Sequence, residues 1–183
     1  MRRSGVVTIV IMLLVIVAIA SYFFLRDESA LQKRNQTSAA QALLIEEEGK
    51  EFTDLSGTPV TLNESFGDVM VVMSWASWCP QCTGDLEKLG TLAKEYQARG
   101  VTVLAINRGE DRYTAERFLN TMPALPGELR VILDSSDHYF TYSAGYAMPE
   151  TIVFAQDGSI AHQTHGELPL EEVKGVLNKL LEE

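Results

Sequence analysis

The chain contains two cysteines, Cys79 and Cys82, and only two residues separate them. Two thiols at this spacing can form a reversible disulfide or supply half of a metal site. A disulfide across so short a loop adds little stability, and a disulfide-stapled scaffold would need more cysteines at wider spacing. The pair therefore indicates redox chemistry or metal binding and not a structural crosslink.

The cysteine pair lies where a predicted buried strand turns into a predicted helix. Val69–Trp75 is a continuous apolar run, which is typical of a central strand buried on both faces. From Cys79 or Pro80 onward, apolar residues recur at helical spacing until about Gly100. A thiolate at the start of a helix faces free backbone N–H groups and the positive end of the helix dipole, which lowers the thiol pKa. We therefore expect Cys79 to be the exposed nucleophile and Cys82 to be the resolving thiol.

Histidines offer a second interpretation of the same cysteines. His162 and His165 could complete a metal site with Cys79 and Cys82, as in a metal-binding domain or metallochaperone. However, the chain has no second pair of closely spaced cysteines, and its histidines lie far downstream of the first pair. We expect no cofactor and no resident metal, and metal binding stays as the alternative function.

The rest of residues 51–183 predicts a mixed α/β domain with helices on both faces of its sheet. Turn residues at Gly57 and at Asp157-Gly158 each separate two short apolar segments, which predicts two hairpins. The expected elements are a hairpin at 52–62, strands at 69–75, 101–106 and 129–133, helices at 79–99 and 114–121, a short helix or turn at 137–142, a hairpin at 151–162, and a C-terminal helix from 169.

An apolar segment precedes this domain. No charged residue occurs from Gly5 to Leu25, and a helix of this length spans about the hydrocarbon thickness of a bilayer. Two arginines before it predict a cytoplasmic N-terminus. We expect residues 1–25 to form a cytoplasmic tip and a single-pass membrane anchor, residues 26–50 a linker, and the domain to lie outside the cytoplasm. Cleavage as a signal peptide after Ala20 is the alternative.

The charge balance excludes some classes of partner. The chain has 25 Asp and Glu against 15 Lys and Arg, and all the acidic residues follow Arg26. An exported domain of this charge is not expected to bind nucleic acid or an anionic lipid surface. The net charge does not identify a substrate.

Residues 71–82, VVMSWASWCPQC, resemble the active-site strand and turn of thioredoxins. Together with the N-terminal hairpin, the segment Met148-Pro149-Glu150-Thr151 and the Asp157-Gly158 turn, they are similar to the TlpA/ResA-like branch of membrane-anchored thiol–disulfide oxidoreductases. The resemblance covers about residues 50–183. It implies a thioredoxin fold with an added N-terminal β-hairpin.

The resemblance also implies an activity. Members of this branch exchange thiols and disulfides with exported proteins, commonly as reductants of apocytochromes or other exported substrates, and receive electrons from a donor in the membrane. Around the disulfide, the counterpart of Pro149 forms a cis peptide bond, as only proline does readily. We expect Pro149, Met148, Trp78 and Pro80 to contact the substrate.

The sequence departs from thioredoxin where a proton acceptor is needed. Thioredoxins carry a buried Asp six residues before the first cysteine, and Met73 occupies that position here. In the TlpA/ResA-like branch an acidic residue lies three positions after the second cysteine, and Asp85 stands there. A buried acid near a thiol can take its proton during exchange, whereas an acid in a first helical turn can simply complement the dipole. Glu150, directly after Pro149, is a second candidate acid.

Overall fold

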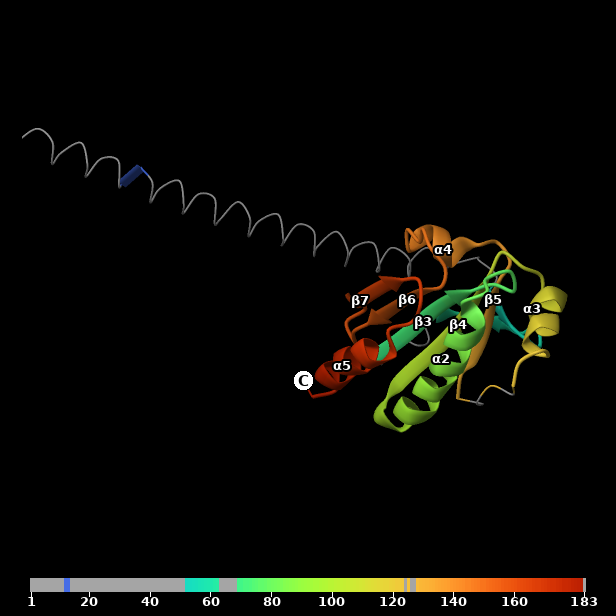
Figure 1. Ribbon diagram of the computed structural model, residues 1–183, viewed down its shortest axis with the longest axis horizontal. Helices are drawn as coiled ribbons and strands as arrows, with labels where there is room; N and C mark the ends of the chain where they lie inside the picture. Colours follow the sequence, from blue (N-terminus) through green and yellow to red (C-terminus); the bar gives the residue numbers. More distant parts are fainter. Residues whose placement is uncertain (1–11, 14–51, 63–68, 124, 126–127, 183) are drawn as a thin grey trace, which may run out of the picture. The chain divides into compact units, whose positions relative to one another are not determined.

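A seven-stranded mixed sheet forms the centre of the part of the chain that the computed structural model describes, which comprises residues 12–13, 52–62, 69–123, 125 and 128–182 (Figure 1). Both predicted hairpins are present as the antiparallel pairs at the two edges of this sheet. From edge to edge the strands are β2 (Pro59–Val60), β1 (Phe52–Asp54), β5 (Arg130–Asp134), β4 (Val101–Arg108), β3 (Val69–Trp75), β6 (Glu150–Phe154) and β7 (Ile160–His165).

β3 is a central strand, and all seven of its residues are buried. It pairs in parallel with β4 on one side and antiparallel with β6 on the other. A strand enclosed on both sides and on both faces is expected to be continuously apolar, which is why the run Val69–Trp75 lacks the alternation of a half-exposed strand. The parallel pairing continues from β4 to β5, so the sheet is mixed, as predicted.

Helices cover both faces of the sheet, in agreement with the prediction (Figure 1). The helices are α2 (Cys82–Tyr96), the 3-10 helix η2 (Gln97–Arg99), α3 (Arg112–Leu119), α4 (His138–Tyr142) and α5 (Leu170–Leu180). Val71 and Met73 of β3 face one side, where the core includes buried residues of α2, α3 and α5. Met70 and Val72 face the other side, where the core includes Tyr139 of α4. Alternate residues of β3 thus hold two separate helical layers.

Three strand ends meet at one edge of the sheet. The register aligns Trp75 at the end of β3 with Asn107 near the end of β4. It also aligns Ser74 with Glu150, the first residue of the antiparallel strand β6. The turn after β3, the loop after β4 and the segment before β6 therefore emerge at the same edge, which is where open α/β sheets bind ligands.

The cysteine-bearing helix starts later than the sequence predicts. α2 begins at Cys82, and Cys79 lies in the turn before it. Two backbone hydrogen bonds make this turn: the Cys79 N–H donates to the Ala76 carbonyl at 3.1 Å, and the Cys82 N–H donates to the Cys79 carbonyl at 3.1 Å. The C-terminal end of this helix agrees with the predicted end near Gly100. The 3-10 helix η2 follows α2, and Gly100 caps η2 with a left-handed φ of 80°. Other predicted boundaries differ by one to a few residues.

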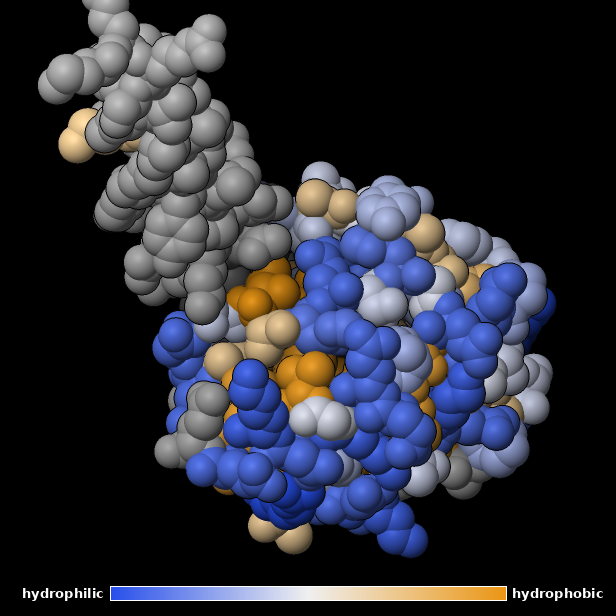
Figure 2. All heavy atoms as spheres, turned by 60° about the vertical axis from the view of Figure 1, so that its left-hand side comes forward, coloured by the Kyte–Doolittle hydropathy of each residue, from blue (hydrophilic) through white to orange (hydrophobic). Residues whose placement is uncertain are grey.

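The predicted anchor and linker lie outside the described residues, apart from Met12 and Leu13. In the ranges that are described, no helix has the length and apolar character needed to cross a bilayer. Figure 2 shows a face of the molecule on which hydrophilic side chains predominate, with smaller hydrophobic areas among them.

Candidate redox site

Cys79 and Cys82 form a disulfide, so the structure shows the oxidised site. The two sulfur atoms lie 2.09 Å apart and the two Cα atoms 5.4 Å apart. The bond joins the turn after β3 to the first residue of α2. Its position at the edge where three strand ends meet leaves it next to loops that a partner protein can reach.

Cys79 is less accessible than the sequence suggests. It is 2% exposed and Cys82 is 0% exposed, so the prediction of an openly exposed Cys79 is wrong for the oxidised form. The hydrogen-bonded turn is the physical reason, because it folds Cys79 back toward the core instead of leaving it at a helix tip. The order of access still agrees with the expected roles, since only Cys79 retains any exposed surface.

The neighbours of Cys79 form the accessible surface. Trp78 is 61% exposed, and Pro80 is exposed as well. The Arg108 guanidinium lies 6.0 Å from the centre of the Trp78 ring. By contrast, Trp75 is fully buried, and Met73 is a core residue, as predicted. Of the two tryptophans, only Trp78 is placed to contact a partner.

The predicted cis peptide bond is present between Met148 and Pro149. Pro149 is buried, and its carbonyl accepts a hydrogen bond from the Gly166 N–H at 2.7 Å. Met148 is half-buried and packs against the core cluster that contains both cysteines. Because Pro149 directly precedes β6, the register of β6 with β3 brings this segment to the edge that carries the disulfide.

Asp85 is buried, as a proton acceptor near the thiols would need to be, but both of its oxygens already have partners. It is 1% exposed. Its Oδ1 lies 2.8 Å from the Lys88 ammonium, and its Oδ2 accepts a hydrogen bond from the Leu168 N–H at 3.0 Å. Asp85 and then Glu167, by hydrogen bonding, raise the pKa of Lys88 above its usual value. The side chain therefore ties α2 to the segment before α5.

Glu150 is the second candidate acid and is fully buried. Its carboxylate accepts hydrogen bonds from the Ser143 hydroxyl and, at 3.1 Å, from the Gln163 amide. The His165 Nε2 lies 3.0 Å from its Oε1. Burial, and secondarily the charge of Glu150, raises the pKa of Tyr139 well above its usual value. Glu150 is thus held by fixed polar groups directly beside the cis proline.

Sequence reasoning missed a third acid, Glu110, in the loop after β4. One carboxylate oxygen accepts from the Ser77 N–H at 2.9 Å and from the Asn107 amide at 2.7 Å, and the other accepts from the Ser77 hydroxyl. Glu110 thereby holds the residue two positions before Cys79. The sequence does contain a signal for Glu110: it is a polar residue just beyond a predicted central parallel strand, and such residues lie at the ligand-binding edge of the sheet.

The histidines that the metal interpretation invoked lie on β7 and face carboxylates. His165 is beside Glu150, and the His162 Nε2 lies 3.9 Å from a Glu172 oxygen. Within the described ranges, no three or more His, Cys, Asp or Glu side chains are arranged to hold a metal ion. The geometry therefore provides no observation that favours the metal interpretation.

Solved structures share this fold at low sequence identity. The pneumococcal exposed lipoprotein thioredoxin Etrx1 from Streptococcus pneumoniae matches with a TM-score of 0.62 at 18% identity, over 70% of this chain and 97% of that one. A secreted Mycobacterium tuberculosis disulfide oxidoreductase homologous to E. coli DsbE matches with a TM-score of 0.60 at 19% identity, over 69% and 92%. These matches show a thioredoxin-like fold.

Sequence comparison defines the class further. The thiol-disulfide oxidoreductase ResA of Bacillus thuringiensis (strain Al Hakam) is 25% identical over 143 residues, which are 76% of this chain and 80% of the relative. That of Geobacillus thermodenitrificans (strain NG80-2) is 27% identical over 150 residues, 79% and 76%. The fold and the cysteine pair thus define a ResA-like thiol–disulfide oxidoreductase. The Redoxin family model matches residues 35–180, and the chain belongs to that family.

Replacing Glu110 tests whether this carboxylate stabilises the redox turn. We expect Glu110→Ala to lower the free energy of unfolding by about 1–3 kcal/mol, because the Ser77 N–H and the Asn107 amide lose their acceptor. Urea denaturation of the oxidised protein measures the change. Glu87→Ala is the matched control, since Glu87 is exposed on α2. Equal effects of the two substitutions would contradict the role of Glu110.

Proposed function

We propose that the domain reduces disulfides in exported proteins through Cys79 and Cys82. The single observation that carries this proposal is the position of their disulfide, at the end of the central strand and beside the cis-proline segment. The ResA relatives are thiol-disulfide oxidoreductases by name, which supports the same reaction class. No cofactor is needed, because the two cysteines carry both electrons.

The exchange has two covalent steps. In the reduced protein, the Cys79 thiolate attacks one sulfur of the substrate disulfide, so that a mixed disulfide forms and the first substrate thiolate leaves and takes up a proton. The Cys82 thiol then loses its proton and attacks the Cys79 sulfur, which forms the intramolecular disulfide and releases the second substrate thiolate. Two electrons pass to the substrate. A dithiol donor, which we place in the membrane, must return them.

The charges around the site favour the reducing direction of exchange. A strongly oxidising disulfide arises where the reduced, thiolate form is stabilised. Here the buried acids Glu110 and Glu150 lie at the edge that carries the site, within a chain of net charge −10. Negative charge disfavours a thiolate and opposes the helix dipole. This balance favours the disulfide in the protein, and hence reduction of the substrate.

Asp85 is proposed to handle the proton of Cys82. It lies three residues after Cys82 on the same helix, close to one turn away, and it is buried. The Lys88 ammonium keeps a positive charge next to the carboxylate. A proton that arrives at Asp85 then leaves toward solvent when the Lys88 ammonium donates one proton to the exposed Glu167 and takes up the proton of Asp85.

The substrate is proposed to contact Trp78, Pro80, Met148 and Pro149. The first two offer exposed surface on the redox turn. The latter two form the cis segment at the same edge of the sheet, where an extended substrate could lie beside Cys79. Exported proteins, including apocytochromes, are the proposed substrates, with residues 1–25 as the membrane anchor and the domain on the extracytoplasmic side.

Cysteine variants of the domain distinguish the two thiols. We expect Cys79→Ser and Cys82→Ser each to abolish turnover of insulin reduction with a dithiol donor, because each removes one of the two covalent steps. Only Cys82→Ser should accumulate a mixed disulfide with the substrate, which mass spectrometry detects. Trapping on Cys82 in the Cys79→Ser variant would reverse the roles, and full activity of both variants would contradict the mechanism.

The pH dependence of release tests Asp85. If Asp85 accepts the proton of Cys82, then Asp85→Asn slows breakdown of the mixed disulfide and changes the pH–rate profile of that step. Glu87→Gln is the matched control, because it makes the same charge change on α2 at an exposed residue outside the proposed proton route, and we expect it to leave the profile unchanged. Stopped-flow measurement of thiol release gives both profiles. A profile unchanged by Asp85→Asn, with only a loss of stability, would leave Asp85 as a structural tie to Leu168.

A further inference from the structure

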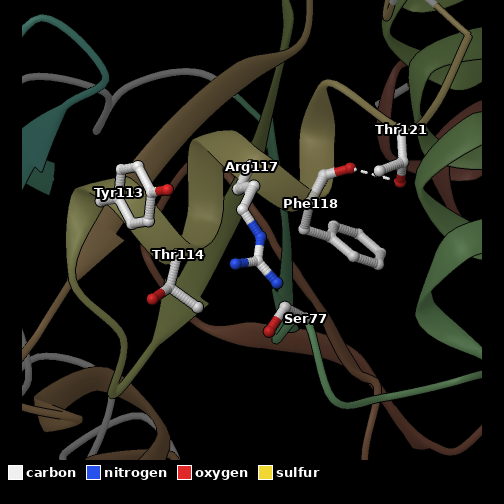
Figure 3. Close-up of a pocket in the computed structure, with 6 residues that line it drawn as sticks. All are labelled: Ser77, Tyr113, Thr114, Arg117, Phe118 and Thr121. Atoms are coloured by element: carbon white, nitrogen blue, oxygen red, sulfur yellow. Dashed lines mark hydrogen bonds between the residues drawn. The ribbon is translucent and has the colours of Figure 1, made fainter.

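A pocket of about 300 Å³ opens beside the redox turn, on the side away from the cis-proline strand (Figure 3). Ser77 of the turn forms one wall, and α3 forms the rest together with Thr121, two residues beyond the end of that helix. The complete lining is Ser77, Tyr113, Thr114, Arg117, Phe118 and Thr121. Nothing in the exchange mechanism above uses this pocket.

Two consecutive acids fix the walls of the pocket. Glu110 holds Ser77 through its backbone N–H and its hydroxyl. Asp111 caps α3 by accepting a hydrogen bond from the Thr114 N–H at 2.8 Å. The Phe118 ring packs on the buried Trp75, with 5.4 Å between ring centres. Because each wall is anchored to the core or to a helix cap, the pocket exists before a ligand arrives.

Arg117 is the charged residue of the pocket lining and determines which ligands the pocket can bind. Figure 3 shows its guanidinium extending from α3 toward Ser77, between hydroxyl-bearing side chains. On the same helix Arg112 lies 3.7 Å from Glu116, whereas no ion pair joins Arg117 to a carboxylate among the residues that the structure describes. A guanidinium binds a carboxylate through two parallel hydrogen bonds. A guanidinium with no ion-pair partner among the described residues attracts a carboxylate to this pocket, even though the protein as a whole is acidic.

The pocket is within reach of a substrate attached to Cys79. Ser77 is two residues from Cys79, so their Cα atoms lie at most about 7.6 Å apart. An extended substrate chain covers that distance, plus the depth of a side chain, in about two to four residues. We propose that this pocket binds an acidic side chain, Asp or Glu, located about two to four residues from the reactive cysteine of the substrate protein. The proposal rests on the proposed exchange function and adds a substrate preference to it.

The test uses peptides that carry one cysteine activated as a disulfide with 4-thiopyridine and that have no charged side chain apart from the Glu under test. Two matched pairs differ only by Glu or Gln, placed three residues before or three residues after the cysteine. Reduced protein reacts with the peptide sulfur, forms the mixed disulfide with Cys79 and releases 4-thiopyridone, whose absorbance gives the second-order rate constant. We expect wild type to prefer Glu over Gln in at least one pair by about fivefold, as for a strong solvent-accessible ion pair.

Arg117→Gln should bring this Glu-to-Gln ratio close to one. Arg112→Gln is the matched control, because it makes the same charge change on α3 at a residue that does not line the pocket. We expect it to keep the wild-type ratio. Absence of a Glu preference in wild type, its persistence in Arg117→Gln, or its equal loss in Arg112→Gln would each overturn the proposal. These outcomes are distinct from failure of the exchange function, in which wild type would react with none of the four peptides.

Discussion

The redox site depends on the pairing of β3 with a strand on each side. Parallel pairing with β4 and antiparallel pairing with β6 bring the ends of three segments, far apart in the chain, to one edge of the sheet. A slip of one residue would turn the side chains of β3 to the opposite faces and break both helical layers. The burial of all seven β3 residues therefore stabilises the register, and the register places Cys79, Glu110 and Pro149 at the same edge.

Buried carboxylates surround this edge, and each is held in a different way. Asp85 is paired with Lys88 and a backbone N–H, Glu110 accepts three hydrogen bonds, and Glu150 lies against a hydroxyl, an amide and an imidazole. Buried charges are tolerated only with such partners. Each carboxylate therefore also holds a loop or a helix end in place, and Glu110 holds the redox turn itself through Ser77.

Much of the fold can be predicted from the sequence. A buried central strand, two hairpins with turn residues and a terminal amphipathic helix each produce a local pattern of apolar and turn residues. The start of α2 at Cys82 is not predicted, because two turn hydrogen bonds compete with extension of the helix. These bonds do not change the spacing of apolar residues along the sequence. The same hydrogen-bonded turn buries Cys79, so the prediction that Cys79 is exposed at a helix N-terminus is wrong as well. The place of Glu110 just beyond the central strand β4 marks it as a polar residue at the ligand-binding edge, but its bonds to Ser77 and the pocket around Arg117 depend on contacts between segments distant in sequence, and such contacts have no local signal.

The claim that the site is a reductant follows from the balance between a helix N-terminus, which favours the thiolate, and buried negative charge, which disfavours it. The reduction potential of the Cys79–Cys82 couple measures this balance directly, by equilibration with glutathione or a dithiol of known potential. The account predicts a low potential, near the roughly −270 mV of thioredoxin. A potential near the roughly −120 mV of the strong oxidant DsbA would show that the thiolate form is stabilised, and it would contradict the account.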